Sequence, residues 1–265
     1  MSAMTELQFQ HVHKAFGTTL ALRDVSFRIA SQSFGVVIGP SGCGKSSLLS
    51  VAAGLDEPSS GYVFLGGREV RGVRDDVALL FQNYNLFPWM TAQANVAFGL
   101  TMRGMSRRAA SAQALDYLND VGLGACAPRI PDELSGGMKQ RVALARALAL
   151  KPSILLMDEP FAALDYQTRK IMQRYLLATR ARTGATILLV THDLAEALTL
   201  ADRLIMLSGT PGTVQEVIDI KATHPRDLSH PVLAGLMRKL EAFLEAEAAS
   251  SEFTTEERNR ILKDG

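Results

Sequence analysis

The residues with the most specific chemistry lie in one short run in the first fifth of the chain. That run comprises Gly39, Pro40, Ser41, Gly42, Cys43, Gly44, Lys45 and Ser46, with Ser47 directly after it. Glycines let backbone N–H groups approach anionic oxygens, and a helix start behind them adds a favourable dipole. Lys45 supplies a mobile positive charge, and Ser46 a hydroxyl for Mg²⁺. The run therefore predicts a cradle for the phosphates of a nucleoside triphosphate bound with magnesium.

A pair of carboxylates ends an apolar run later in the chain. Residues 154–157 are all apolar, and Asp158 and Glu159 follow directly. At the tip of such a strand Asp158 is suited to hold magnesium opposite Ser46. Glu159 is suited to orient or deprotonate a water for in-line attack on the terminal phosphoryl group. A surface acidic pair is the alternative, and the apolar run that leads into it argues against that alternative.

Two further polar side chains follow apolar runs in the same way. Gln82 comes after residues 77–81, and His192 comes after residues 186–191. Ligands of α/β sheets gather at the carboxyl ends of the strands, so Gln82 is placed to reach a metal or a water. His192 is placed to sense the terminal phosphate, although a lone histidine is more often structural.

A second anion-binding helix start is predicted at residues 134–141. Ser135, Gly136 and Gly137 open a strongly helical segment that continues through Gln140. Exposed N–H groups and the Ser135 hydroxyl would both attract phosphate oxygens there. A plainly capped helix is the alternative.

The pattern of apolar residues supplies the elements that would position these groups. Buried strands are expected at 33–38, 77–81, 154–159 and 186–191, and shorter alternating strands at 7–12, 20–29 and 61–67. Helices are expected at 46–53, 92–100, 107–121, 136–150, 166–182 and 194–200. The glycine-rich run thus sits at a strand-to-helix turn, which argues against a chance turn. Residues 83–150 form a helical lobe of their own.

Two aromatic sites have open alternatives. Phe16 precedes Gly17 in a probable turn, where it would either stack on a purine ring or be buried. The segment Asn85–Met90 carries aromatic and apolar groups around a proline, which suits either docking of another protein's helix or packing between lobes.

The overall composition limits which kinds of partner and which cellular location are expected. The chain has 265 residues, 47% of them apolar, with 28 basic and 27 acidic side chains and a net charge of +1. This balance does not favour a nucleic-acid partner. Cys43 and Cys126 are expected to be reduced thiols, because a disulfide would obstruct the cradle. Residues 1–7 lack a basic region followed by an apolar core, so a cytoplasmic location is expected.

The chemically active segments follow one another in an order that resembles ATP-binding-cassette (ABC) ATPases. They are Gly39–Ser46, Gln82, Leu134–Gln140, Asp158 with Glu159, Ala163–Asp165 and His192. The resemblance covers roughly residues 5–225, and Leu134–Gly137 is the segment that separates this family from other phosphate-loop enzymes. A phosphate-loop kinase or GTPase would leave those residues unexplained.

The resemblance implies a role for each site residue. Phe16 would stack on adenine, Lys45 would act with Glu159 and His192 in catalysis, and Gln82 would link the metal site to the helical lobe. The implied metal ligands are Ser46, Gln82 and Asp158. Ser135, Gly136, Gly137 and Gln140 would contact the nucleotide of a partner subunit, and Asp165 would lie at that dimer interface.

The implied fold is α/β, a phosphate-loop (RecA-like) ATPase core with an antiparallel β subdomain and an inserted α-helical subdomain. The ABC ATPase domain would span 1–230, with its core at about 1–82 and 152–230 and the helical subdomain at about 83–151. Residues 231–265 would form a C-terminal helical extension, amphipathic through Leu236, Leu240 and Phe243. Packing, dimer contact and regulation are the open roles for this extension.

Three segments resemble those of the nitrate, sulfonate and taurine importer group within this family. They are Phe87–Thr91, Asp158–Phe161 and Leu207–Gly212. A basic residue often follows this last segment in that group, whereas Thr213 stands here. Implied cofactors are ATP and Mg²⁺. Implied partners are a second cassette, integral membrane permease subunits and, indirectly, a solute-binding protein, with the chain peripheral on the cytoplasmic face of the membrane. A soluble mechanical ATPase is the alternative.

Overall fold

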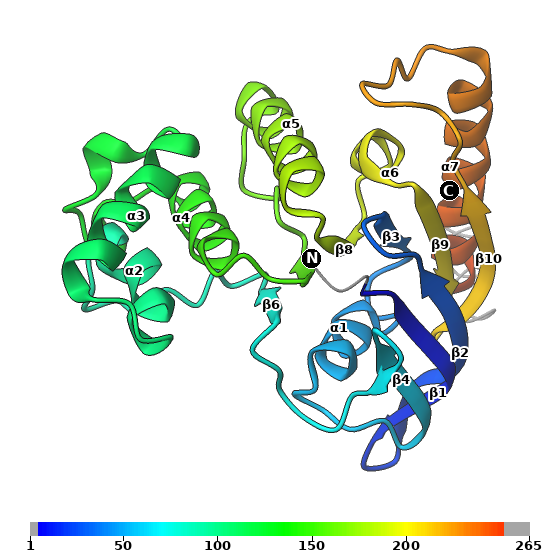
Figure 1. The fold of residues 1–265 in the computed structure, drawn as a ribbon. Coiled ribbons are helices and arrows are strands. Elements are labelled where there is room, and N and C mark those ends of the chain that lie inside the picture. The colour runs from blue at the N-terminus through cyan, green and yellow to red at the C-terminus, as the bar shows by residue number, and fades with distance from the viewer. Residues whose placement is uncertain (1–4, 252–265) are drawn as a thin grey trace, which may run out of the picture.

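The computed structural model describes residues 5–251, and the last 14 residues of the predicted extension lie outside the described range. Its centre is a six-stranded sheet (Figure 1). The strands are, in spatial order, β10 (Thr213–Asp219), β9 (Arg203–Ser208), β3 (Phe34–Ile38), β8 (Thr186–Thr191), β7 (Ile154–Asp158) and β6 (Val77–Leu80). Five of them run parallel, and β10 pairs antiparallel with β9.

A smaller antiparallel sheet covers one face of this central sheet. It contains, in spatial order, β2 (Thr19–Ile29), β1 (Leu7–Phe16), β4 (Ser60–Leu65) and β5 (Arg68–Glu69). Helix α1 (Lys45–Ala53) packs between the two sheets, and its apolar side chains share a core with Leu7, Val37 and Leu188. The expected antiparallel strands before the phosphate run are therefore present, and the predicted strand at 33–38 belongs to the central parallel sheet.

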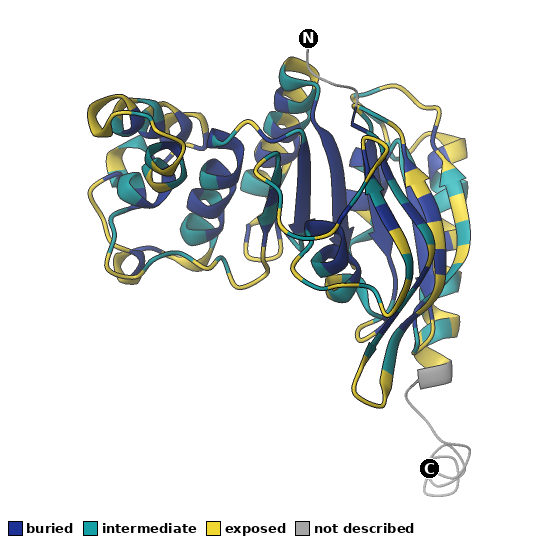
Figure 2. Cartoon of the chain, turned by 60° about the horizontal axis from the view of Figure 1, so that its bottom comes forward, coloured by how far each residue is buried: buried dark blue, intermediate teal, exposed yellow. Residues whose placement is uncertain are grey.

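On the other face of the central sheet lie α5 (Tyr166–Thr183), α6 (Leu194–Leu200) and α7 (Pro231–Ser251). The remaining helices of the described range are α2 (Ala92–Met102), α3 (Arg107–Asp120) and α4 (Gly136–Ala149), with 3₁₀ turns at Gly124–Cys126 and Pro131–Glu133. Alternate residues of β3, such as Val36 and Val37, point into different cores on the two faces. Strands buried on both faces read as continuous apolar runs. Figure 2 shows the central strands in the dark colour of buried residues.

The helical lobe lies to one side of the sheet, as predicted from the change in pattern after residue 82. Figure 1 shows α2, α3 and α4 grouped together there, joined to the core after β6 and before β7. Helix starts follow capping chemistry: Thr91 accepts from the N–H of Ala94 at 3.1 Å, and Asp165 accepts from Thr168 at 3.0 Å. Each predicted helix is present within about two residues of its expected bounds.

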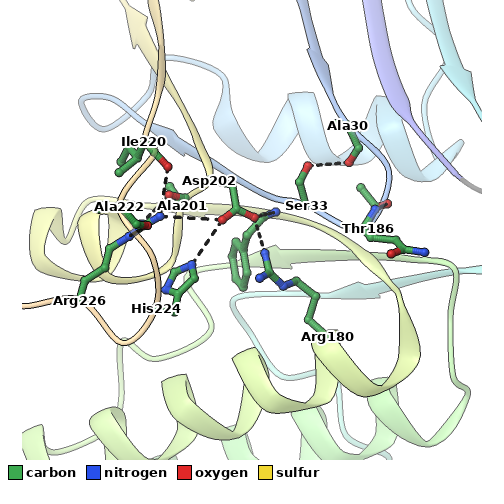
Figure 3. A network of polar contacts seen from close by, with 12 residues as sticks. Ala30, Ser33, Arg180, Thr186, Ala201, Asp202, Ile220, Ala222, His224 and Arg226 are labelled. Atoms are coloured by element: carbon green, nitrogen blue, oxygen red, sulfur yellow. Dashed lines mark hydrogen bonds and ion pairs between the residues drawn. The ribbon is translucent and has the colours of Figure 1, made fainter.

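The segment between β10 and α7 is fastened to the core by one carboxylate. Asp202, between α6 and β9, accepts from the Phe34 N–H at 2.8 Å, from Arg180, and from His224 Nε2 at 3.3 Å (Figure 3). Arg226 is buried beside it and donates to the carbonyls of Leu198, Ala201, Ala222 and Ile220. Burial alone would raise the pKa of Asp202, but its hydrogen bonds and the Arg180 charge outweigh burial and lower that pKa. This network ties His224 and Arg226, in the segment before α7, to the core.

Candidate functional site

The predicted phosphate cradle joins β3 to α1. Gly44 is the N-cap of α1, and within residues 5–251 no side chain caps that helix start. Its first N–H groups are thus left for an anion, as helix starts require. Lys45 Nζ lies inside the curve of the loop, donating to the carbonyls of Gly39 at 2.7 Å and Pro40 at 2.6 Å. This arrangement can surround a phosphate group with backbone donors and one ammonium.

Ser46 and Asp158 meet although they are far apart in the chain. The Ser46 hydroxyl donates to Asp158 Oδ2 at 2.7 Å, across the gap between α1 and the end of β7. Burial is the main reason that the pKa of Asp158 lies above its ordinary value, although Ser46 and Lys45 act in the opposite direction. A nearby divalent cation would favour the ionised carboxylate. The sequence predicted this pair as a metal site, and the structure brings the two oxygens together.

Glu159 is the point at which the other predicted polar residues converge. Its Oε1 lies 2.9 Å from His192 Nδ1, and its Oε2 accepts from Gln82 Nε2 at 3.3 Å. The three residues follow β7, β8 and β6, which are neighbours in the sheet, so their carboxyl ends deliver them to one edge. A glutamate, a histidine and an amide in contact can position a water and move its proton.

The backbone of Glu159 is itself unusual. Its φ of +47° lies in the left-handed region, which costs a non-glycine residue about 1–2 kcal/mol. The surroundings hold it there: its N–H donates to the Val190 carbonyl at 3.0 Å, and its carbonyl accepts from Gln140 Nε2 at 3.0 Å. Strain maintained by specific contacts is typical of functional positions.

Gln140, which the sequence grouped with the nucleotide-binding residues, supports the site from inside the same chain. Its side chain is buried, and its Oε1 accepts from the Ala163 N–H at 3.1 Å while its Nε2 bonds to Glu159. It therefore links α4 to the 158–165 segment. This contact was not predicted from the sequence. Nothing in the sequence shows that the Gln140 side chain is buried next to the backbone of residues 159 and 163.

The second predicted anion-binding start lies in the helical lobe. Ser135 caps α4 by accepting from the Met138 N–H at 3.3 Å, and a side chain on Gly137 would meet the Ala163 carbonyl at 3.0 Å. In Figure 1, α4 and the cradle helix α1 are well separated. The structure thus does not bring Ser135, Gly136 and Gly137 together with Gly39–Ser46 of the same chain.

The two aromatic sites are both on the surface. Phe16 is 49% exposed at the end of β1, with Lys14 Nζ 4.7 Å from its ring centroid. Trp89 is 73% exposed at the tip of the loop before α2. Phe16 is therefore available for stacking, and Trp89 for contact with another molecule.

Sequence reasoning missed the residues that hold this loop in place. Asn95 is fully buried in α2, and its amide bonds to backbone groups of Phe87, Met90 and Thr91 at 2.8–3.1 Å. Arg146 of α4 donates to the carbonyls of Tyr84 and Asn85. A buried asparagine in an otherwise apolar helix face was the available signal.

Arg169 was also missed. It sits one turn after the α5 N-cap and donates to Asp193 Oδ2 at 2.6 Å and to the Leu164 carbonyl at 3.2 Å. It therefore connects the turn that carries Asp165 to the turn that follows His192.

Fold and site together define a phosphate-loop ATPase with an inserted helical lobe. A family model described as ABC transporter matches residues 22–162. The chain belongs to the ABC transporter family, as an ATP-hydrolysing subunit.

Individual relatives agree with this assignment. The chain is 47% identical to the nitrate import ATP-binding protein of Synechocystis sp., over 77% of each chain. It is 48% identical to the taurine import ATP-binding protein of Yersinia pestis, over 76% of this chain and 78% of the relative. A dimeric ATP-binding cassette bound to ADP and Pi superposes with a TM-score of 0.75 at 32% identity, covering 82% of this chain and all of that one.

Proposed function

We propose that this chain is the ATPase subunit of an importer for a small solute of the nitrate, sulfonate or taurine type. It would act as a pair of cassettes on the cytoplasmic face of the membrane, bound to integral permease subunits. A solute-binding protein would deliver the solute to those permease subunits. The relatives named for nitrate and taurine import support the solute class. None of the helices in the described range is long and apolar enough to cross a bilayer.

The observation that carries the proposal is the convergence of Gln82, Glu159 and His192 beside the cradle. Glu159 would accept a proton from the attacking water, while His192 holds that carboxylate and contacts the terminal phosphate. Lys45 and the α1 N–H groups would stabilise charge on the phosphate oxygens. Phe16 would stack on the adenine ring.

The residues present fit magnesium. Ser46 Oγ and Asp158 Oδ2 are two hard oxygen ligands that lie 2.7 Å apart. Gln82 bonds to Glu159, which directly follows Asp158, and its amide oxygen would serve as a third ligand. Mg²⁺ is commonly held by one or two protein ligands together with substrate phosphates. When bound, magnesium would neutralise charge on the phosphate oxygens.

The second cassette would complete the site. Ser135, Gly136 and Gly137 open α4 with an anion-binding start, yet they lie away from the cradle of their own chain. A second copy could place this start on the bound nucleotide, with Asp165 at the interface and Gln140 supporting Glu159 from behind. In this proposal the cassette spans residues 1–230, and its helical subdomain at about 83–151 is the lobe that faces the permease.

The permease contact is assigned to the loop Phe87–Thr91. Its tip exposes Trp89, while Asn95 and Arg146 hold the loop backbone in one conformation. A rigid aromatic anchor on an ordered loop is suited to a protein–protein contact.

Co-purification tests the proposal. Affinity-purified protein from its native cell should bring down an integral membrane partner, and Trp89→Ala should release that partner while ATP turnover of the isolated subunit stays near wild type. Met102→Ala, an equally exposed apolar site outside the loop, is the matched control. Recovery of no membrane protein with the wild-type chain would refute the transporter role. Ligand binding by the solute-binding protein encoded beside this chain identifies the solute.

A further inference from the structure

The turn between β9 and β10 lies directly against the back of the phosphate cradle. A side chain on Gly212 would place its Cβ 2.0 Å from the Cys43 carbonyl, and one on Gly39 would meet the Leu207 carbonyl at 2.3 Å. Only glycine allows backbone to approach backbone this closely. The backbone of the cradle and the backbone of this turn are therefore in direct contact, with no side chain between them.

Strand β2 fixes the same turn from the other side. The Gly212 N–H donates to the Ala21 carbonyl, and the Arg23 N–H donates to the Gly212 carbonyl, both at 2.9 Å. Leu22 between them is fully buried. The turn, β2 and the cradle thus form one packed unit, in which a displacement of the turn displaces Cys43.

The C-terminal helix reaches this unit through an acidic side chain. Glu247, near the end of α7, accepts from the Gly209 N–H at 2.7 Å. A charged acceptor makes this a stronger bond than a neutral pair would form. Burial is the main reason that the pKa of the Cys43 thiol is raised, and the Glu247 charge makes a smaller contribution in the same direction.

The rest of α7 is anchored to the core. Leu233 and Leu240 are buried, and Lys239 Nζ lies 2.6 Å from Glu216 Oε1 on β10. The Asp202 network of Figure 3 holds the segment before the helix. Because both the start and the middle of α7 are held, Glu247 is presented to Gly209 by a rigid helix.

We propose that α7 is a positioning element for the nucleotide site, in which Glu247 holds the Gly209–Gly212 turn against the phosphate cradle and so maintains affinity for ATP. The inference rests on the proposed role of Gly39–Ser46 in binding phosphates. When Glu247 is lost, the turn relaxes and the cradle must be ordered again each time ATP binds, which weakens binding without altering Glu159. The extension would thereby act as a built-in control on nucleotide affinity.

The test compares full-length Glu247→Ala, Glu247→Gln and Glu245→Ala. Glu245 is an exposed glutamate on the same helix, so it is the matched control. Glu247→Ala should raise the Kd and KM for ATP roughly three- to tenfold with kcat nearly unchanged. Glu247→Gln keeps an acceptor for the Gly209 N–H and should restore most of the affinity. Glu245→Ala should match wild type.

Three outcomes would overturn the inference. The first is equal ATP affinity in Glu247→Ala and Glu245→Ala. The second is tighter binding in both Glu247 variants, which would assign charge repulsion to Glu247. The third is an affinity loss in Glu247→Gln as large as that in Glu247→Ala, which would show that an acceptor for the Gly209 N–H does not maintain the affinity. If the wild-type chain itself neither binds nor hydrolyses ATP, the proposed function fails instead, so the two failures are distinguishable.

Discussion

At the scale of single residues, the proposed hydrolytic chemistry would depend on how Glu159 is held. Its side chain is 17% exposed and bonded to His192 and Gln82, and its peptide is fixed in a left-handed conformation by Val190 and Gln140. This leaves the carboxylate little freedom to rotate away from a water. A preoriented base is more effective than a mobile one, because the entropy cost of orienting it is met during folding and not during the reaction.

Replacing Glu159 by Gln should reduce ATP turnover by about a hundredfold or more, because the amide cannot accept a proton from water. Glutamine has nearly the same size, so ATP binding should persist and the closed dimer should accumulate. Phosphate release, ATP titration and gel filtration in the presence of ATP measure these three quantities. Glu241→Gln, at an exposed glutamate on α7, is the control, and unchanged turnover in Glu159→Gln would exclude Glu159 as the base.

At the scale of elements, α6 shows how a helix start positions the residue before it. Asp193 caps α6 by accepting from the Glu196 N–H at 3.0 Å, and buried Glu196 accepts from the Thr191 hydroxyl at 2.8 Å. His192 lies between Thr191 and Asp193, and both of these neighbours are held by hydrogen bonds. Burial is the main reason that the pKa of Glu196 is raised to about 7, although Thr191 and Arg169 favour its ionised form.

Glu196 should make stability depend on pH. Its folded pKa of about 7 exceeds the ordinary glutamate pKa of 4.5, so between these two pH values the folded state binds more protons than the unfolded state and stability falls as pH rises. Above this window the loss levels off at about 3 kcal/mol. Glu196→Gln should be more stable than wild type at about pH 8 and should flatten the profile between about pH 5 and pH 7.

Urea unfolding across that pH range measures the effect of Glu196. Glu241→Gln, which removes an exposed carboxyl, should follow the wild-type profile. Parallel profiles for wild type and Glu196→Gln would show that Glu196 titrates normally in the folded protein.

At the scale of the whole molecule, the proposed arrangement gives each chain two halves of different sites. The cradle lies between the two sheets, whereas the Ser135 start of α4 lies in the helical lobe. Tyr166 and Ile171, on the outer surface of α5 beyond Asp165, are 69% and 58% exposed. Apolar groups left on the surface next to an incomplete site are consistent with a face that a second copy covers.

Mixing two inactive variants tests this arrangement. Lys45→Ala damages the cradle and Ser135→Arg damages the α4 start, so each homodimer should be inactive. A mixed dimer has one site with both defects and one with neither. Random pairing of equal amounts should therefore recover about a quarter of wild-type phosphate release. Activity in the mixture no greater than in either variant alone would contradict a site shared between chains.

Much of the fold and site could be predicted from sequence, because the signals are local. The Gly39–Ser46 run lies between an apolar strand and a helix, and Gln82, Asp158 and His192 follow apolar runs of strand length. These patterns depend on residues within one turn or one strand, where propensity and burial act directly. The helix bounds agree with the structure within about two residues for the same reason, whereas β5, β9 and β10 were not among the predicted strands.

The remaining features depended on which elements become neighbours. Sheet order places β7 between β8 and β6, and only that order brings His192 and Gln82 to Glu159. Gln140 behind Glu159, Asn95 beneath Phe87 and Glu247 at Gly209 likewise join segments that no local pattern connects. The sequence by itself predicted the glycine-rich turn, the polar residues at the strand ends and most of the elements. Tertiary structure alone decided which polar groups share partners, because packing between distant segments sets those distances.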